Sequence, residues 1–456
     1  MRLISTVLLS LALFSGPLMA EDLKLKNGSE LIVEQDLRSP RDTVMLAFLG
    51  GAGLLKPSEQ GLSTLLTLIL NEGPEGVSAA DFKKELFLLG GELSYSAGSR
   101  QTFVSVTAPS ANVAKVLELA LSTLKKPKFD AENYQIALAK LTASVAQQED
   151  NMASQLRYFA IRDAFSNHPD VLDGNTSRTS LKNLNLEKVK ASLPKLFDAR
   201  YLLTVATGPS SPADIQKLLN SELEKSGFLA PKLEKRVFVS AAKDVKSKGQ
   251  KVVLLNKAGA TDNQIRYIVR RKIPLDNPDM VALDLANKAL GEGMQGSLFK
   301  VLREQRGLTY SAGSGISDNL GYIGVSSFAS TDKLANLMKG IDEVVAQQST
   351  VVIDKPTAEL LKGDALTKFK ESRELPGDRL VQVINARIYG RDLNFSEKED
   401  EYIAKASEAD ITRLGKEFFS VKDASIYIMG DKTKLLPVLK GLGFKDVRVV
   451  EPAAVL

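Results

Sequence analysis

The feature that most constrains the fold is an internal repeat: the two halves of the chain carry the same order of elements. Residues 95–99 and 310–314 share the letters YSAGS at an offset of 215 (310 minus 95). Each copy is followed by a strand-like alternation and then by helical periodicity: 102–107 and 112–124 in the first half, 322–327 and 332–345 in the second. We therefore expect two copies of one folding unit.

A second repeat supports this expectation. Leu196-Phe197 leads through an apolar strand to Gly208, and Phe418-Phe419 leads through another to Gly430, at an offset of 222 (430 minus 208). Strands at the start of each half and helices after them predict an α+β fold. The expected architecture is two duplicated lobes, each a mostly antiparallel sheet with helices packed on one side.

The N-terminus has the features of an export signal. A basic start at Arg2 precedes the mostly apolar run 3–14 and small residues up to Ala20, and Glu21-Asp22 follows. This pattern predicts a secretory signal peptide over 1–20 and a periplasmic protein of Gram-negative type. The apolar run is too short to span a bilayer and the chain has no cysteine for a lipid, so no membrane anchor is expected.

The middle of the chain predicts the domain boundaries. Residues 231–250 are charged and poor in periodic apolar positions, which is typical of a linker. The sequence therefore predicts an N-terminal lobe over 21–230 and a C-terminal lobe over 251–456.

Composition excludes several functions. The chain has one histidine, His168, and no cysteine, so it cannot build a histidine- or thiolate-ligated metal centre. A carboxylate site for magnesium or calcium stays open, although no oxygen-rich loop pattern is present. Without Arg2 the net charge is +4 (59 minus 55) and the basic residues are dispersed, which argues against nucleic acid as a partner. His168 itself is interpreted as a loop histidine that bonds to backbone.

Two further classes of site lack their motifs. No G-x-S-x-G sequence is present, so a metal-free serine hydrolase has little support. The glycines of 50–53 are not followed by G-K-[ST], so a nucleotide-binding loop is not predicted.

The segment 57–70 predicts a buried helix. Pro57, Ser58 as cap and Glu59 in the first turn form its start, and 61–70 is apolar nearly all round. The surrounding sequence, GGAGLLKPSEQGLSTLLTLILNEG followed by an amphipathic helix and GGELSYSAG, resembles the opening of the insulinase/pitrilysin family of zinc peptidases, in the subfamily of the processing peptidases.

The resemblance implies that a zinc site has been lost. Active members carry His-x-x-Glu-His on this helix, with two ligands on one face and a general base between them. In this chain Thr64 and Leu68 stand at the ligand positions, Thr67 at the base, and Ser144 at the third ligand. None of these residues can take its role, so this chain is expected to bind no cofactor of its own.

A second family motif is retained. GEGMQGSLFKVLREQRGLTY, residues 291–310, resembles the most recognisable motif of the C-terminal lobe. The resemblance implies that Arg303 and Tyr310 reach the substrate from the lobe opposite the zinc, where they stabilise charge on the peptide carbonyl. We expect a helix that ends at Gly307 and a strand that opens at Tyr310, with both side chains on one side.

These observations favour a composite enzyme. The leading hypothesis is a non-zinc-binding subunit of a periplasmic heterodimer, inactive alone, whose homologous partner carries His-x-x-Glu-His and the zinc. Peptide is the expected substrate, and Arg303 and Tyr310 are the residues that this chain contributes. The alternative is a non-catalytic scaffold or peptide-binding protein of the same fold.

Overall fold

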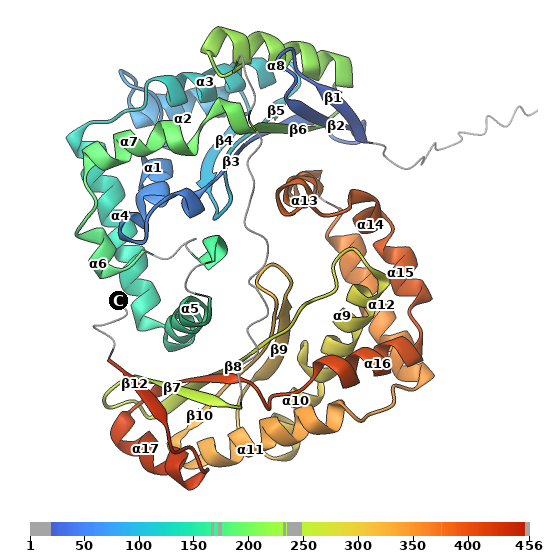
Figure 1. The fold of residues 1–456 in the computed structure, drawn as a ribbon. Helices are drawn as coiled ribbons and strands as arrows, with labels where there is room; N and C mark the ends of the chain where they lie inside the picture. The colour runs from blue at the N-terminus through green and yellow to red at the C-terminus, as the bar shows by residue number, and fades with distance from the viewer. Residues whose placement is uncertain are drawn as a thin grey trace, which may run out of the picture.

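The computed structural model describes residues 20–165, 168–171, 176–230, 234, 249–374 and 376–451. They form two lobes, each built on one six-stranded sheet, at the top and bottom of Figure 1. The predicted α+β class with two duplicated lobes is confirmed. None of the described helices combines the length and the apolar character needed to cross a bilayer. The predicted signal peptide, apart from Ala20, and most of the predicted linker lie outside the described residues, so the domain boundaries stay predictions.

The first sheet has the strand order β1-β2-β6-β3-β5-β4. Its neighbouring strands are antiparallel except β2 and β6. Alternate residues of a strand face opposite sides, so Val44 and Leu46 of β3 enter one core while Met45 and Ala47 enter another. The strands are β1 (Ala20–Lys24), β2 (Glu30–Gln35), β3 (Arg41–Leu49), β4 (Glu92–Ala97), β5 (Gln101–Pro109) and β6 (Leu202–Gly208).

The second sheet has the order β12-β7-β11-β8-β10-β9. Its last five strands repeat the order of the last five in the first sheet. The edge strand differs, because β1 is antiparallel to its neighbour whereas β12 is parallel to β7. The strands are β7 (Lys251–Asn256), β8 (Asp262–Arg270), β9 (Ala312–Ser317), β10 (Tyr322–Ser330), β11 (Ser425–Gly430) and β12 (Val447–Val450).

One of the two sequence repeats is in structural register. Gly208 and Gly430 end the equivalent strands β6 and β11, as their offset of 222 predicts. A Cβ at Gly208 would lie 2.3 Å from Oδ1 of Asp42, and one at Gly430 would lie 2.1 Å from Oδ1 of Asn263. Both lobes therefore require glycine at this position, where β6 ends beside the start of β3 and β11 ends beside the start of β8.

The letters YSAGS are not equivalent in the two lobes. Tyr95 lies within β4, is 3% exposed, and donates its hydroxyl to the carbonyl oxygen of Ala120 (2.8 Å). Tyr310 precedes β9 and is 69% exposed. The strands β4 and β9 begin 220 residues apart (312 minus 92), against 215 for the letters. Matching these letters between the lobes was therefore wrong, although the duplication itself holds.

The helices of the N-terminal lobe cover the outer face of its sheet. Side chains from α1, α3, α4, α7 and α8 form one core with β2, β3 and β5. Helix α1 is buried as predicted. The elements are η1 (Ala52–Leu54), η2 (Pro57–Glu59), α1 (Leu62–Leu70), α2 (Ala79–Leu88), α3 (Val113–Lys125), α4 (Ala131–Asp150), α5 (Met152–Ala164), η3 (Pro169–Val171), α6 (Arg178–Leu181), α7 (Leu186–Leu196), η4 (Ala199–Tyr201) and α8 (Pro212–Ser226).

The helix predicted from Ser58 begins later, at Leu62. Gly61 precedes it with a φ of 94°, in the left-handed region, so the short turn η2 and α1 cannot form one helix. A Cβ at Gly61 would also lie 2.7 Å from the side chain of Thr176. The capping role predicted for Ser58 was therefore wrong, since Gly61 occupies that position for α1.

The C-terminal lobe repeats this arrangement around β7, β8, β10 and β11. Its core takes side chains from α9, α11, α16 and α17, among others. The elements are α9 (Pro278–Gly291), α10 (Ser297–Phe299), the π-helical turn η5 (Lys300–Gln305), α11 (Thr331–Gln348), α12 (Lys355–Glu371), α13 (Pro376–Tyr389), α14 (Leu393–Glu397), α15 (Glu399–Lys405), α16 (Glu408–Phe418) and α17 (Lys432–Gly441).

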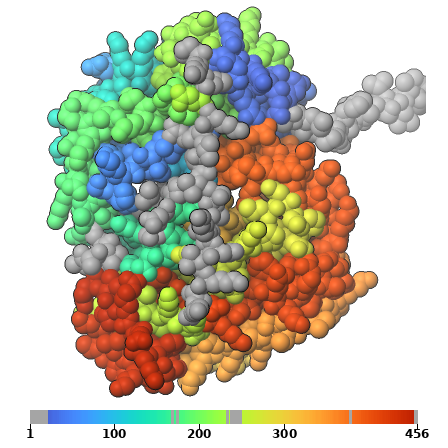
Figure 2. All heavy atoms as spheres, viewed as in Figure 1, coloured from blue at the N-terminus to red at the C-terminus, as the bar shows by residue number. Residues whose placement is uncertain are grey.

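The lobes exchange one helix each across their interface. Helix α5 packs on the inner face of the second sheet, and α13 packs on the inner face of the first (Figure 1). Polar contacts support both: Tyr427 donates its hydroxyl to Asp163 of α5 (3.0 Å), and Arg379 of α13 lies 2.8 Å from Glu34 of β2. The two halves visible in Figure 2 are thus joined reciprocally. The sequence predicted helices on one side of each sheet. The structure has those helices and one further helix, from the other lobe, on the opposite side.

Candidate functional site

Helix α1 presents together the two residues that the resemblance places at the zinc-ligand positions. Thr64 and Leu68 are partly exposed while most of α1 is buried, and their spacing of four residues places them on one face. Thr67 is buried, and its hydroxyl donates to the carbonyl oxygen of Thr64 (2.9 Å). Histidine, cysteinate and carboxylate hold zinc in proteins, so this face lacks the ligands.

Ser144, which the resemblance places at the third ligand position, is equally unsuited to hold zinc. Ser144 is exposed on α4, which packs against α1. The acidic residues nearby are engaged: Glu72 binds Lys140 (2.9 Å), and Glu149 accepts from Nε of Arg178 (2.9 and 2.6 Å). Among the described residues no three histidine, cysteine or acidic side chains gather into a metal site.

His168 has a structural position, as its loop sequence predicts. It is 5% exposed, and its Nδ1 accepts the backbone N–H of Asp170 (3.3 Å). Arg100 donates to both oxygens of Asp170 (2.5 and 2.9 Å). Burial lowers the pKa of His168; Asp170 opposes this effect and Arg100 adds to it. A neutral imidazole bonded to backbone results.

The structure brings Arg303 and Tyr310 together. The guanidinium carbon of Arg303 lies 4.1 Å from the ring centroid of Tyr310 and 4.8 Å from that of Phe299. Arg303 extends from the turn η5, which Gly307 terminates with a φ of 57°. The strand β9 begins at Ala312, so the prediction that Tyr310 opens it was two residues early.

The polar groups of this stacked pair have no partner among the described residues. Tyr310 is 69% exposed, and within the described residues no hydrogen bond or ion pair engages the Arg303 guanidinium or the Tyr310 hydroxyl. Stacking between two rings holds the guanidinium plane while its N–H groups stay available. The neighbouring Arg306 differs, since it binds Glu343 (2.6 Å). The geometry therefore suits recognition of a carbonyl or carboxylate oxygen by Arg303 and Tyr310.

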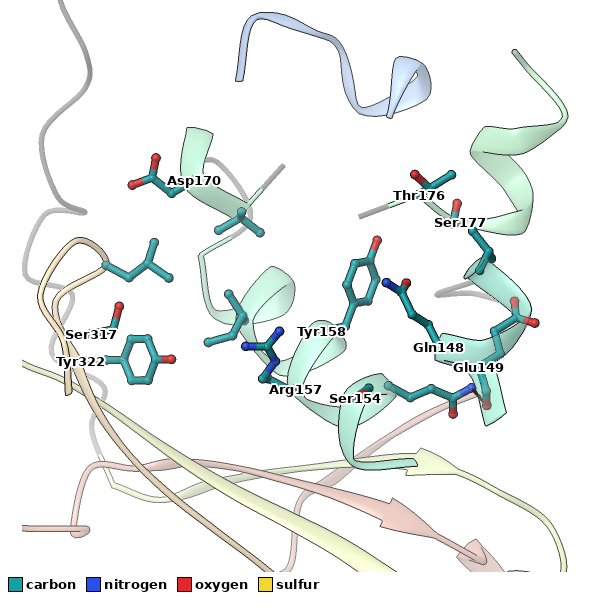
Figure 3. A pocket seen from close by; sticks show the side chains of 15 residues that line it. Gln148, Glu149, Ser154, Arg157, Tyr158, Asp170, Thr176, Ser177, Ser317 and Tyr322 are labelled. Carbon is teal, nitrogen blue, oxygen red and sulfur yellow. Dashed lines mark hydrogen bonds between the residues drawn. The ribbon is translucent and has the colours of Figure 1, made fainter. Parts of the chain in front are cut away.

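A cavity of about 550 Å³ lies between the lobes, where α4, α5 and η3 meet the hairpin of β9 and β10. In Figure 3 Arg157 reaches into it from α5, and Tyr322 from the facing hairpin. Ser154 and Ser317 also line it. Sequence reasoning missed these residues because they come from segments far apart in the chain and form no motif.

A second cavity, of about 480 Å³, lies beside α9. Asp284 and Glu399 line it, and burial raises the pKa of Asp284 to about 7, with nearby carboxylates, Glu399 first, adding to the rise and Lys288 opposing it. A raised carboxyl pKa means that the fold favours the protonated form. The stability that the protonated Asp284 carboxyl contributes is therefore fully present below pH 3.8, the ordinary pKa of an aspartate. It is lost as the pH rises through about 7, the pKa of Asp284 in the folded chain.

We expect Asp284→Asn to be more stable than the natural chain at pH 8, by about 1–3 kcal/mol, and closer to it at pH 5. Urea unfolding at both pH values measures this difference. The control is Asp364→Asn: the pKa of Asp364 is lowered by Lys288, so this variant should lose stability at pH 8. An Asp284→Asn gain that is equal at both pH values would contradict the assignment.

The two sheets, the helix without zinc ligands and the exchanged helices define a two-lobed, peptidase-type fold without a metal site in its described residues. Family models agree with this class. The model described as insulinase (peptidase family M16) matches residues 31–171, and the model described as peptidase M16 inactive domain matches residues 183–362. The chain belongs to the insulinase family, and its sequence lacks the His-x-x-Glu-His motif.

Relatives and solved structures extend the match over most of the chain. A Helicobacter pylori protein named non-peptidase homolog YmxG is 23% identical over 416 residues, 89% of this chain and 92% of the relative. The peptidase M16 inactive domain from Pseudomonas fluorescens has a TM-score of 0.77 at 18% identity, covering 91% of this chain and 98% of that one. The periplasmic protease PqqL from Escherichia coli has a TM-score of 0.75 at 13% identity, covering 91% of this chain and 45% of that one.

Proposed function

We propose that this chain is the non-zinc-binding subunit of a periplasmic heterodimeric zinc peptidase. The observation that carries the proposal is the asymmetry between its two motifs. Thr64, Thr67 and Leu68 cannot bind zinc, whereas Arg303 and Tyr310 form a stacked pair whose polar groups have no hydrogen bond or ion pair within the described part of the chain. A chain that had simply lost activity would have no chemical need for the second motif. The partner supplies zinc and general base, and this chain supplies Arg303 and Tyr310.

The chemistry of peptide hydrolysis suits this division. Attack of water on the scissile carbonyl builds negative charge on its oxygen, and donors placed beforehand at that oxygen lower the barrier. The Arg303 guanidinium and the Tyr310 hydroxyl are such donors, and a charged donor gives the stronger hydrogen bond. The binding of substrate backbone by the same pair would orient the carbonyl toward the partner's zinc.

The match to part of a longer protease also supports a partner. Its two lobes align with 45% of the longer protease PqqL, so a second two-lobed chain would complete an assembly of similar extent. The export signal predicted over 1–20 and the periplasmic location of PqqL support the same compartment.

The test is purification of the tagged chain from its native periplasm, with metal analysis and a peptide-cleavage assay. A second chain with His-x-x-Glu-His is expected to co-purify, and the pair should cleave peptides until a chelator is added. The chain expressed alone should carry no stoichiometric zinc and show no cleavage. One equivalent of zinc together with proteolysis by the isolated chain would refute the proposal.

A scaffold or peptide-binding protein is the second candidate, favoured by the likeness to the non-peptidase homolog YmxG. The scaffold and the composite enzyme differ in their expected response to substitution of Arg303 and Tyr310. A scaffold should keep its function when Arg303 and Tyr310 are replaced, whereas the composite enzyme should lose turnover.

A further inference from the structure

Two guanidinium groups lie beside the cavity between the lobes without an internal partner. Arg157 of α5 lines both the cavity of about 550 Å³ and an adjoining one of about 350 Å³, and Arg266 of β8 lines the second. Within the described ranges neither group takes part in an ion pair or a hydrogen bond. Arg266 is partly buried, so its guanidinium is less well hydrated than that of a fully exposed arginine.

The carboxylates of the larger cavity do not fill this role. Glu149 is bound by Arg178 (2.6 Å), and Asp170 is bound by Arg100 (2.5 and 2.9 Å). Both acidic residues line the cavity, yet each is neutralised by its own arginine. The charge of Arg157 is therefore left for a ligand.

Tyr322 lines the larger cavity together with Arg157. It begins β10, and its register places it on the same face of the sheet as Arg266, four positions along the paired strand. Gly324 leaves room for the ring of Tyr322, because a Cβ at position 324 would lie 3.2 Å from Cε2 of that ring. Burial raises the pKa of Tyr322, and the charges of Arg266 and Arg157 oppose that rise. The three groups thus act on one another.

The two guanidinium groups carry like charges that repel each other. Burial lowers the pKa of Arg266, and the like charge of Arg157 lowers it further while Tyr322 opposes the shift. An anion held between two guanidinium groups would remove that repulsion and satisfy both planar donor sets.

We propose that Arg157 and Arg266 bind the carboxylate of a peptide, with the Tyr322 hydroxyl as a further donor. Carboxylate is favoured over phosphate because the rest of the wall includes Val145, Ile161 and Leu320, which suit peptide side chains. The smaller cavity is also lined by Ser311, which follows Tyr310 in the chain. The identification of the ligand as a peptide rests on the proposed function; the anion site itself belongs to this chain alone.

The test is calorimetric titration of the purified chain with a short N-acetylated alanine-leucine peptide, as the free acid and as the C-terminal amide, and with inorganic phosphate. The free acid is expected to bind at least about tenfold more tightly than the amide. Arg157→Ala and Arg266→Ala should each weaken its binding about 10- to 100-fold. The matched control, Arg162→Ala, removes an arginine of the same helix that lines neither cavity, and should leave affinity unchanged.

Three results would overturn the proposal. They are equal affinity for acid and amide, phosphate binding as tight as the acid, or unchanged affinity in Arg157→Ala. Circular dichroism melting of each variant separates lost binding from lost folding. Because the titration uses no partner chain, failure to find a zinc-bearing partner would leave this result standing, and a negative titration would leave the heterodimer proposal standing.

Discussion

Replacing Arg303 with alanine in the reconstituted heterodimer is expected to lower kcat/KM about 10²- to 10³-fold, the usual effect of removing one preorganised oxyanion donor. The guanidinium is fixed between Phe299 and Tyr310 before substrate binds, so little reorganisation is needed during the reaction. The loss of kcat/KM is measured from initial rates of peptide cleavage, with enough of the variant chain to saturate the partner subunit. Size-exclusion chromatography should show that the heterodimer persists.

Three further variants separate the roles within this pair. Tyr310→Phe keeps the ring beneath the guanidinium and removes only the hydroxyl, so a smaller loss of about tenfold is expected. Arg303→Lys keeps the charge but loses the planar stack and should not restore the full rate. Arg306→Ala is the control, because Arg306 is bound to Glu343. If Arg303→Ala kept full turnover, the pair would not lie at the reacting carbonyl, and the scaffold function would be favoured.

The repeat in the sequence predicted the duplicated fold but not its register. Gly208 and Gly430 could be matched because the close approach of Asp42 and Asn263 excludes a side chain in both lobes. The letters shared by Tyr95 and Tyr310 carry no such constraint, since one ring is buried and the other is exposed. A single residue that a steric requirement fixes is therefore better evidence that two positions are equivalent than a longer stretch of identical residues without such a requirement.

The candidate site was predictable only where residues are close in sequence. Arg303 and Tyr310 are seven positions apart and share one motif, and the structure brings them into contact. Arg157 and Arg266 line the same cavity only because α5 packs on the sheet of the other lobe. The hydrophobic periodicity of the sequence does not predict that packing. The start of α1 was misjudged for a local reason, because the left-handed conformation of Gly61 cannot be read from its letter.

The exchange of helices makes one buried ion pair important for stability. Arg100 and Asp170 have side chains 4% and 8% exposed, and the guanidinium of Arg100 also lies 4.5 Å from the ring centroid of Tyr389. Arg100 follows β4 in the first lobe, whereas Tyr389 ends the exchanged helix α13. This arginine therefore joins the loop of His168 to the helix that the second lobe contributes.

Arg100→Ala is expected to lower the free energy of unfolding by about 3–5 kcal/mol, because Asp170 would remain buried without its counter-ion. Urea unfolding followed by circular dichroism measures the change. The control, Lys26→Ala, breaks an ion pair with Glu224 in which both side chains are exposed (61% and 59%), and should cost no more than about 1 kcal/mol. The double variant Arg100→Met/Asp170→Leu should recover much of the lost stability, because it removes both charges and leaves none buried. If Arg100→Ala cost no more than the control, solvent would have to reach Asp170 in the folded chain, and the stability of the interface would then depend on the apolar packing of α5 and α13 alone.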